Sequence, residues 1–320
     1  MSTIAVIVDT LSAQGRGNLA VRLVCADGSA LPPFDAGAHI DVHFARGLIR
    51  PYSIASAPHE RDHYVLCVKR EAASRGGSAY VHERLRVGDR LDVSLPRNLF
   101  GLREGSRHVL MAGGIGITPL LSMAESLEKS GVPFELHYYV RERIDTAFKA
   151  RWAAGFTHGR VHVHSSIDGE SARDALPAAL HAPVDGMQLY LCGPDSFMRH
   201  VAQSAREFGW QAGAIHQEAF GAPAVQTRTD DESFQVVLAS SGRTFEVTAQ
   251  RSIASVLLEG GVSVPLSCEM GICGACLTPV IDGVADHRDT VQSDTEKCAA
   301  NQQIALCCSR ARTPRIVIGL

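Results

Sequence analysis

The chain has 320 residues, of which 45% are hydrophobic and 20% charged, and its formal net charge is −3. This composition is ordinary for a globular protein, and the small acidic excess argues against a general nucleic-acid binder, which would be strongly basic. No apolar run approaches the roughly 18–20 residues of a membrane span, and the N-terminus lacks the basic segment of a signal peptide. The length predicts two or three domains.

Residues 1–101 show apolar segments with period-two alternation, separated by glycine and proline. The segments 19–25, 39–44 and 64–69 are examples. Such alternation, with turn residues at regular intervals, is typical of strands that bury one face. We therefore predict an antiparallel barrel or sandwich as the first domain.

The pattern changes near residue 102, where strands begin to alternate with helices. Thr118 before Pro119 predicts a helix start, with the threonine as N-cap and the proline at the first helical position, and Gly131 predicts the end of that helix. Strands that alternate with helices are typical of a parallel sheet, so we predict an α/β domain over residues 102–222. Its predicted strands are 108–112, 135–140, 160–165 and 188–192, and its last helix is 195–208.

A stretch of small and polar residues, 223–232, has the composition of a linker. The third predicted domain covers residues 233–320. It begins with a predicted hairpin over 234–247, and Ser252 predicts the N-cap of a short helix that ends at Leu258.

The cysteines are concentrated after that helix. The chain has nine, an odd number that does not suggest a secreted disulfide framework and fits a reducing cytoplasm. Those in the third domain are Cys268, Cys273, Cys276, Cys298, Cys307 and Cys308. The first three form the spacing C-x4-C-x2-C, which with a distant fourth cysteine is the plant-type pattern of a [2Fe–2S] cluster. Gly271 and Gly274 would let the backbone curl around the inorganic sulfides.

Two alternatives accompany this interpretation. The first is a zinc site, although structural zinc usually shows paired C-x2-C spacings and this region has one such pair. The second concerns the fourth ligand, because Cys307 and Cys308 are adjacent and on a strand would face opposite ways. Cys298 lies in a polar stretch that predicts a helix or loop. We select Cys307, while the spacing alone leaves Cys308 open.

A glycine-rich loop, Gly113-Gly114-Ile115-Gly116, lies between a predicted strand and a predicted helix. Glycines let the backbone approach a pyrophosphate, and a helix N-terminus favours its negative charge. A tight strand–helix turn is the alternative. Two further features favour a nucleotide crevice: Thr118-Pro119 after the loop, and Cys192-Gly193-Pro194-Asp195 after the fourth predicted strand. Both lie where carboxyl ends of parallel strands meet helices. A buried core thiol is the alternative for Cys192.

Two segments of the first domain are suited to a flavin. Arg50-Pro51-Tyr52-Ser53 offers a guanidinium for a phosphate, a ring for stacking and a hydroxyl for a ring nitrogen. Gly76-Gly77-Ser78 precedes a predicted helix over 79–85 and forms a possible phosphate nest. Each segment alone is more often a surface arginine or an ordinary cap, but their joint presence before a nucleotide domain favours a flavin phosphate site.

These segments together resemble the phthalate dioxygenase reductase family, which includes vanillate demethylase reductase subunits. The first two domains resemble the wider ferredoxin–NADP reductase superfamily. The resemblance extends from about residue 4 to residue 320, and no single motif carries it. The matching segments are 50–53, 76–78, 113–119, 192–194, 218–220, the cysteine cluster and 285–289.

The resemblance implies a multidomain fold: an antiparallel β-barrel that binds FMN, an α/β parallel-sheet domain that binds NADH, and a C-terminal β-grasp ferredoxin domain with a [2Fe–2S] cluster. It also aligns Cys307 with the fourth ligand. Three residues are assigned to hydride transfer: Ser53, Cys192 and Glu218. The cofactor-binding residues are Arg50, Tyr52, Ser53, Lys69, Gly76, Gly77, Ser78, Gly113, Gly114, Gly116, Thr118, Cys192, Gly193, Pro194, Asp195 and Phe220.

The residues after the second predicted strand of the α/β domain leave the electron donor open. They read Arg141-Glu142-Arg143-Ile144-Asp145. An acidic residue there suits the free ribose of NADH, and an arginine suits the 2′-phosphate of NADPH. The choice of NADH therefore follows from the resemblance.

The expected function is a reductase that passes electrons from NADH through FMN and the cluster, one at a time, to a Rieske-type aromatic-ring oxygenase or demethylase. One rival is an NAD(P)H-dependent reductase for a cytochrome P450 or another acceptor. A rival of another class is a binding protein whose cysteines hold zinc. We expect a cytoplasmic monomer that binds neither nucleic acid nor membrane.

Overall fold

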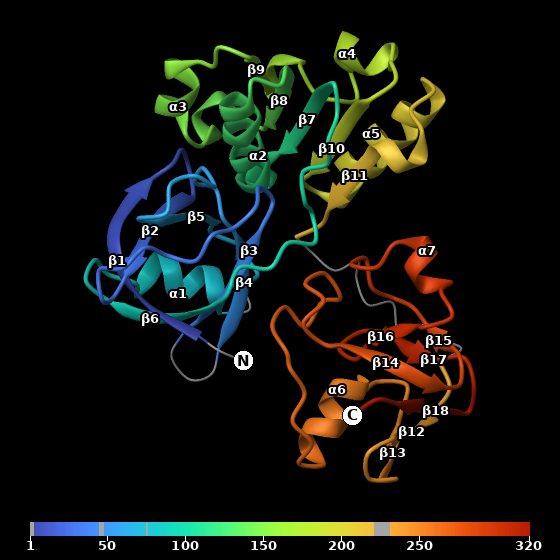
Figure 1. The fold of residues 1–320 in the computed structure, drawn as a ribbon. Coiled ribbons are helices and arrows are strands. Elements are labelled where there is room, and N and C mark those ends of the chain that lie inside the picture. The colour runs from blue at the N-terminus through green and yellow to red at the C-terminus, as the bar shows by residue number, and fades with distance from the viewer. Residues whose placement is uncertain (1–2, 45–47, 75, 221–230) are drawn as a thin grey trace. The chain divides into compact units, whose positions relative to one another are not determined.

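The computed structural model of the chain describes residues 3–44, 48–74, 76–220 and 231–320 (Figure 1). It divides into two compact units, Met1–Phe220 and Gly221–Leu320. The predicted linker, 223–232, lies outside the described residues as far as residue 230. Each unit is described by itself.

The first part of the first unit is a six-stranded antiparallel sheet with the order β4-β3-β6-β1-β2-β5. Its side chains alternate between core and surface, so that Val6 and Val8 of β1 are both fully buried. All six strands and the helix α1 contribute to one hydrophobic core, and the two outer strands, β4 and β5, contact each other, so the sheet curls into a barrel, as predicted. The elements are β1 Thr3–Ala13, β2 Asn18–Cys25, β3 His39–His43, β4 Ile49–Ser53, β5 Tyr64–Lys69, α1 Gly77–Glu83 and β6 Arg90–Ser94.

The second part of the first unit is a five-stranded parallel sheet with the order β11-β10-β7-β8-β9. Hydrophobic cores lie on both faces, one of them beneath α2 and the other beneath α5 (Figure 1). Such double coverage is typical of parallel sheets. The strands are β7 Arg107–Gly113, β8 Phe134–Val140, β9 Gly159–Ser165, β10 Met187–Cys192 and β11 Ile215–Glu218; the helices are α2 Ile117–Ser130, α3 Lys149–Ala154, α4 Ala178–His181 and α5 Asp195–Glu207.

Three local predictions for this unit need correction. Helix α2 has Gly116 as its N-cap and no side-chain cap, so the predicted capping role of Thr118 is wrong. A 3₁₀ turn over Gly114–Gly116 leads directly into the helix, and Thr118 lies within its first turn. Helix α1 begins at Gly77, two residues earlier than predicted. The short strand β11 has no predicted counterpart. Gly131, in contrast, ends α2 with the expected positive φ of 73°.

The second unit contains a five-stranded sheet with the order β13-β12-β18-β14-β16 and a small ladder of β15 with β17. The predicted hairpin is confirmed as the antiparallel pair of β12 and β13. Ser252 caps α6 by accepting a hydrogen bond from the backbone N–H of Ser255 at 3.1 Å. The elements are β12 Phe234–Leu238, β13 Thr244–Val247, α6 Ile253–Glu259, β14 Leu277–Asp282, β15 Ala285–Asp286, α7 Asp294–Lys297, β16 Gln303–Ala305, β17 Arg310–Ala311 and β18 Arg315–Ile318.

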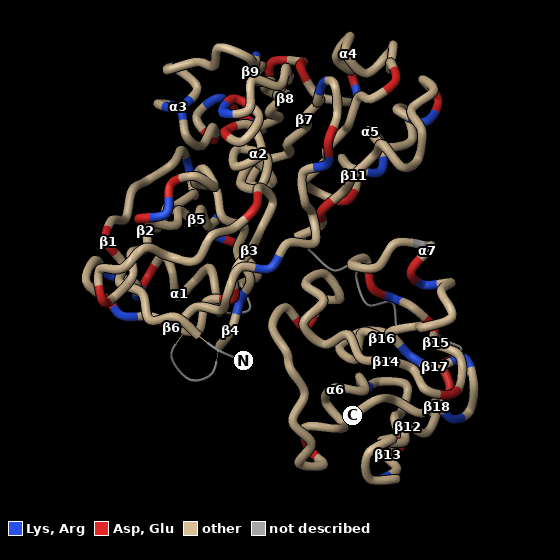
Figure 2. Tube along the Cα trace, in the orientation of Figure 1, with Lys and Arg blue, Asp and Glu red and all other residues tan. Residues whose placement is uncertain are grey.

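Among the described helices, none has the length and apolar composition required to cross a membrane. Basic and acidic residues are interspersed along the trace in both units (Figure 2). This mixture agrees with the small net charge of −3.

Candidate functional site

The loop between α6 and β14 carries three of the four predicted cluster ligands, Cys268, Cys273 and Cys276, and all three side chains are buried. The backbone turns sharply there because Gly271 and Gly274 have positive φ values of 72° and 68°. Glycine adopts this conformation without strain. The two glycines therefore bend the loop in the way that their place in the sequence predicts.

The predicted fourth ligand, Cys307, reaches this loop from the segment after β16. Its thiol hydrogen-bonds with Cys268 and Cys276, and Cys273 hydrogen-bonds with Cys268. These shared hydrogen bonds lower the pKa of Cys268 and Cys276 and raise the pKa of their donors, Cys273 and Cys307. Thiolates are the form that metals bind. Four sulfur donors so gathered are a donor set that fits a [2Fe–2S] cluster.

Cys308 and Cys298 are placed differently. The Cys308 sulfur lies against the cysteine loop, where a Cβ added at Gly271 would come within 2.5 Å of it. It also hydrogen-bonds with Cys307, so it is a neighbour of the four-sulfur group. Cys298 follows α7 and is exposed. The backbone N–H of Met270 donates to the Cys268 sulfur at 3.3 Å, which is the kind of amide contact that stabilises added negative charge.

A buried charge network holds the start of the second unit in place. Arg288 forms ion pairs with Asp231 and Asp286, and the Arg310 guanidinium lies 3.7 Å from Asp231 and 5.0 Å from the ring centroid of Phe234. Opposite charges gather around β15 and β17 in Figure 2. Breaking one partner of a buried pair is strongly destabilising. This role for Asp231 could not be predicted, because it depends on a partner 57 residues away.

Two loops of the parallel sheet approach each other at van der Waals distance. A Cβ added at Gly116 would lie 2.2 Å from the Cys192 carbonyl oxygen, and one at Gly113 would lie 2.8 Å from Pro194 Cδ. A Cβ at Gly193 would meet the Gly113 Cα at 2.9 Å. The loops follow β7 and β10, which are neighbours at the point where the strand order reverses, the usual place of nucleotide sites.

The other predicted residues of these loops have distinct surroundings. Gly114 has a φ of 55° and no atom within 4 Å of an added Cβ, so its backbone borders open space as a pyrophosphate path requires. The Thr118 hydroxyl donates to the Ile115 carbonyl at 3.1 Å. Asp195 pairs with Arg199 at 2.9 Å on the surface of α5. These glycine positions fit the close approach of a dinucleotide.

The three residues assigned to hydride transfer meet in the structure. Ser53, at the end of β4, donates from Oγ to Glu218 Oε2 at 3.5 Å, across 165 positions of sequence. Glu218 ends β11 and is the strand partner of Cys192. Burial raises the pKa of Glu218 to about 8, although the hydrogen bond from Ser53 opposes the shift. Burial is the main cause that raises the pKa of Cys192 well above its usual range, and the Glu218 carboxylate, when it is ionised, adds to the rise. At pH 7 the site therefore holds a neutral carboxyl and a neutral thiol.

Beside this group, β4 and α1 form a narrow cradle. Arg50 and Tyr52 are two positions apart on β4, so their side chains lie on the same face of the strand. A Cβ added at Gly77, the first residue of α1, would lie 2.7 Å from Arg50 Cγ and 3.0 Å from the Tyr52 hydroxyl. Burial raises the pKa of Tyr52, so its phenol stays neutral. A guanidinium, a phenol and a glycine turn at one place fit a flavin phosphate and its attached ring.

The loop before α1 is held by hydroxyl hydrogen bonds. Ser78 Oγ accepts from the Glu71 backbone N–H at 3.2 Å and donates to Ser74 Oγ at 3.0 Å. Ser74 Oγ also accepts from the Gly76 backbone N–H at 3.2 Å. Lys69 pairs with Glu71 at 3.2 Å. Glu71 therefore contacts both predicted residues, Ser78 through its backbone N–H and Lys69 through its carboxylate. Phe220, the last predicted residue, packs against the core beneath α2.

The acidic residues after β8 have partners in the barrel. Arg16 pairs with Glu142 at 2.7 Å and with Asp145 at 2.8 Å. Glu142 and Asp145 also form a capping box around a 3₁₀ turn. These two carboxylates therefore connect the two sheets of the first unit.

Arg143, in the same segment, faces the loop after β9. Its guanidinium lies 3.5 Å from Asp168 and 2.8 Å from Glu170. Both carboxylates pair with the Arg143 guanidinium, so a 2′-phosphate would have to displace them, whereas a free ribose would not.

Comparison with known protein families gives two matches. The model of the 2Fe-2S iron–sulfur cluster binding domain matches residues 236–312. The model of the N-terminal domain of dimethylamine monooxygenase subunit DmmA-like proteins matches residues 95–215.

Whole-chain relatives are also clear. The chain is 45% identical to vanillate O-demethylase oxidoreductase of Pseudomonas sp. (strain HR199 / DSM 7063), over 99% of this chain and 100% of that protein. The solved structure of phthalate dioxygenase reductase matches with a TM-score of 0.73 and 36% identity, over 100% of this chain and 98% of that one. An intact type IV self-sufficient cytochrome P450 monooxygenase matches with a TM-score of 0.87 and 35% identity, over 99% of this chain but only 41% of that longer protein.

Proposed function

The chain belongs to the phthalate dioxygenase reductase family, and on that premise we propose that its electron acceptor is a Rieske-type oxygenase component. As a member of the family it is a reductase that passes electrons from NADH through FMN and a [2Fe–2S] cluster to an oxygenase component. Two of the similar proteins are named for vanillate O-demethylation and phthalate dioxygenation. These names support an aromatic-ring oxygenase or demethylase as the partner.

The meeting of Ser53 with Glu218 is the observation that supports the proposed entry site for electrons. The barrel contributes the hydroxyl and the parallel sheet contributes the carboxyl, at an oxygen–oxygen distance of 3.5 Å. We assign Ser53 to the flavin ring, and Glu218 to holding a proton beside it. We assign Cys192 to the base of the nucleotide crevice, where its thiol is uncharged. With both groups uncharged, the lining would place no fixed negative charge beside the flavin.

The remaining assignments follow the cradles that the fold forms. Arg50, Gly76, Gly77 and Ser78 would hold the FMN phosphate, with Tyr52 beside the ring and Lys69 at the edge of the site. Gly113, Gly114, Gly116, Thr118 and the Cys192–Asp195 loop would hold NADH, and Phe220 would approach the flavin. Cys268, Cys273, Cys276 and Cys307 would hold the cluster. When bound, the flavin would accept two electrons as a hydride from NADH and pass them singly to the cluster. Neither NADH nor the cluster can make this conversion alone.

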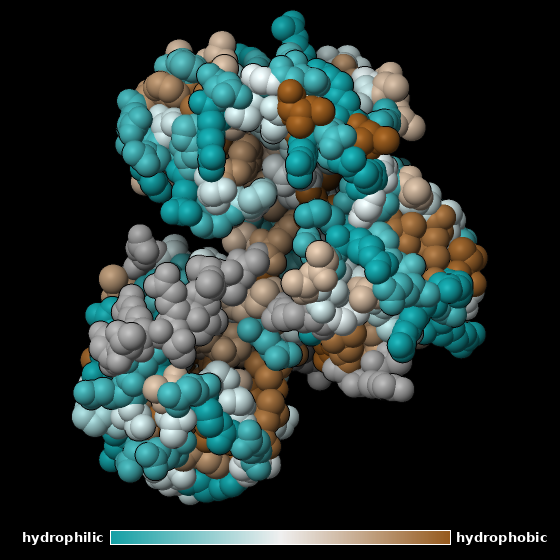
Figure 3. Space-filling view, turned by 180° about the vertical axis from the view of Figure 1, so that it is seen from behind, coloured by the Kyte–Doolittle hydropathy of each residue, from teal (hydrophilic) through white to brown (hydrophobic). Residues whose placement is uncertain are grey.

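The boundaries 1–101, 102–222 and 233–320 complete the proposal as flavin, nucleotide and ferredoxin domains. We also place the protein in the cytoplasm as a monomer. None of the nine cysteines, all of which lie in the described residues, forms a disulfide, as a reducing compartment favours. Hydrophobic residues form small separate groups on the face drawn in Figure 3. The exposed large hydrophobic side chains belong to many elements: Val87, Leu95, Leu99, Ile144, Ile167, Val184, Leu258, Ile281 and Val284. A scattered pattern of this kind does not require a permanent partner.

The cytochrome P450 fusion supplies a second candidate acceptor, because nearly the whole of this chain matches part of that protein. Reconstitution separates the two. The purified holoprotein and NADH are combined with either a Rieske oxygenase component that acts on an aromatic acid or a ferredoxin-dependent P450. We expect coupled product formation with the Rieske component and slow, uncoupled NADH consumption with the P450. Faster coupled turnover with the P450 would reverse the assignment.

A further inference from the structure

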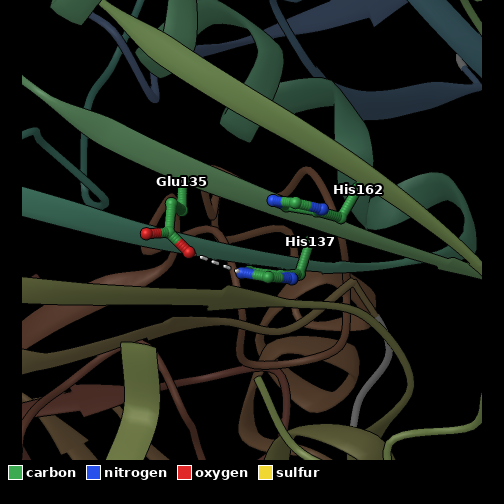
Figure 4. A group of neighbouring side chains, drawn as sticks. All are labelled: Glu135, His137 and His162. Carbon is green, nitrogen blue, oxygen red and sulfur yellow. Dashed lines mark hydrogen bonds and ion pairs between the residues drawn. The ribbon is translucent and has the colours of Figure 1, made fainter. Parts of the chain in front are cut away.

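Three side chains of metal-ligating types lie together on the parallel sheet, on strands that carry none of the residues assigned to the flavin, the nucleotide or the cluster. They are Glu135 and His137 on β8 and His162 on β9, and Figure 4 shows them on one face of the two strands. Glu135 and His137 are two positions apart, so they share a face. His162 is the strand partner of His137. The sheet therefore brings the three side chains to one place.

The spacing of these side chains is close to that of a metal site. One ligand atom from each of the three lies within 4.8 Å of the other two. Metal–ligand bonds of about 2.1 Å in a tetrahedral site place ligand atoms about 3.4 Å apart, so the widest separation would have to shorten by up to about 1.4 Å. His162 is exposed and can move, whereas His137 is 4% exposed and holds its position.

His164 supports the imidazole of His137 from its other side. His137 Nδ1 lies 3.1 Å from His164 Nε2, and His137 Nε2 lies 3.3 Å from Glu135 Oε2. An ion on His137 Nε2 would leave the proton on Nδ1, where it donates to His164. Metal-bound histidines usually donate their second N–H in this way. The hydrogen bond to His164 would therefore hold the His137 ring in the orientation that a bound ion needs.

The Glu135 carboxylate is held by an ion pair on one of its two oxygens. Arg107 pairs with Oε1 of Glu135, which leaves Oε2 for an ion and orients the carboxylate.

We propose that Glu135, His137 and His162 bind a divalent ion of the zinc class, with water as the fourth ligand. Two imidazole nitrogens and one carboxylate oxygen are the ligands of open zinc sites. The bound ion would tie the edge strand β9 to β8. The alternative is a stack of imidazole rings that only packs, since His137 and His162 are parallel within 10° at 4.9 Å.

Isothermal titration calorimetry tests the proposal. ZnCl2 is titrated into the holoprotein in a buffer that has been freed of metal ions. The variants are His162→Gln, which removes an exposed ligand, and His158→Gln, a matched exposed histidine just before β9. We expect one site that His162→Gln weakens at least tenfold and His158→Gln leaves unchanged. Equal binding by wild type and His162→Gln, or no binding by wild type, would overturn the proposal.

X-ray absorption at the zinc edge adds a readout that separates this site from the cysteines. The proposal predicts nitrogen and oxygen neighbours at about 2.0–2.2 Å and no sulfur shell at about 2.3 Å for the first equivalent of zinc. A sulfur shell at one equivalent would assign the ion to thiols and contradict the site. Thermal unfolding of each variant without zinc verifies that the fold is retained.

Discussion

The cysteine loop and the Ser53–Glu218 site differ in how the chain builds them. Three of the cysteine sulfurs come from nine consecutive residues, 268–276, and their curl depends on glycines inside the same loop. The Ser53–Glu218 contact joins two different sheets across 165 residues. Most of the proposed cluster site is therefore a local feature that a short motif specifies, whereas the Ser53–Glu218 contact exists only when two sheets have folded and packed.

This difference predicts separable failures. Damage to the cysteine loop should stop electrons from leaving while hydride transfer continues. Damage to the contact between sheets should slow the entry of electrons while the cluster still assembles. Variants of the two regions thus distinguish exit from entry.

The largest effect is expected from Cys276→Ser. Loss of one thiolate removes the cluster, so NADH-dependent cytochrome c reduction should fall at least about a hundredfold. Ferricyanide, which can take electrons directly from flavin, should still be reduced. Electron paramagnetic resonance of the reduced protein measures the cluster, and Cys298→Ser, at an exposed cysteine, is the control. Full cytochrome c reduction by Cys276→Ser would contradict the ligand assignment.

The next effect concerns Glu218. Glu218→Ala removes the proton-holding group and should slow flavin reduction by NADH about a hundredfold, the lower end of the range for a positioned acid or base. Glu218→Gln keeps the shape and the hydrogen-bonding of a neutral carboxyl, so we expect a loss of less than about fivefold. Stopped-flow absorbance measures both rates. If glutamine is as harmful as alanine, the carboxyl does not act in its neutral form.

The raised pKa of Glu218 also makes a prediction about stability. The usual value of 4.5 rises to about 8 in the folded protein, so the favourable neutral state is fully present below pH 4.5 and is lost as pH rises to 8. Across that window, wild type should lose stability relative to Glu218→Gln by about 1.4 kcal/mol for each pH unit. Urea unfolding of the apoprotein at pH 6, 7 and 8 measures it. A difference that does not change with pH would show that Glu218 is ionised.

A smaller effect is expected from Gly116→Ala. The added methyl would lie 2.2 Å from the Cys192 carbonyl oxygen, so the two loops must separate. Overpacking of this kind costs about 1–3 kcal/mol, and the KM for NADH should rise because the crevice is distorted. Gly213→Ala is the matched control, because an added Cβ there has no atom within 4 Å. Equal melting temperatures for the two variants would contradict the close packing of the loops.

The smallest effect concerns the nucleotide preference. Asp168→Asn combined with Glu170→Gln removes two negative charges beside Arg143. The arginine then becomes available to a 2′-phosphate, and kcat/KM for NADPH should rise about threefold to tenfold relative to NADH. Asp195→Asn, whose surface pair with Arg199 lies on α5, is the control. An unchanged ratio of kcat/KM for NADPH to kcat/KM for NADH would show that the ribose does not bind beside Arg143.

The sequence predicts the features that rest on local chemistry. The C-x4-C-x2-C spacing, the glycine loop after β7 and the cap at Ser252 each depend on neighbours within a few residues, and the architecture of barrel, parallel sheet and ferredoxin-like domain agrees with the structure and the relatives. Local rules also explain one error. Thr118 has the residue type of a cap, but the 3₁₀ turn at Gly114–Gly116 satisfies the helix start first.

The features that the sequence does not predict rest on distant contacts. No pattern indicates that Arg288 will pair with Asp231, or that Arg16 will bind the acidic residues after β8. The histidines of β8 and β9 appear as ordinary alternating strand residues until the strand register places His162 beside His137. Strand pairing, and not residue type, creates each of these sites.

Anaerobic stopped-flow mixing of the holoprotein with NADH tests the central claim most directly, that electrons enter at the Ser53–Glu218 site and leave through the four cysteines. We expect the flavin absorbance to fall first and the cluster absorbance to follow, with Glu218→Ala slowing both phases and Cys276→Ser abolishing only the second. A cluster that is never reduced, or that is reduced at an unchanged rate in Glu218→Ala, would contradict this order of transfer.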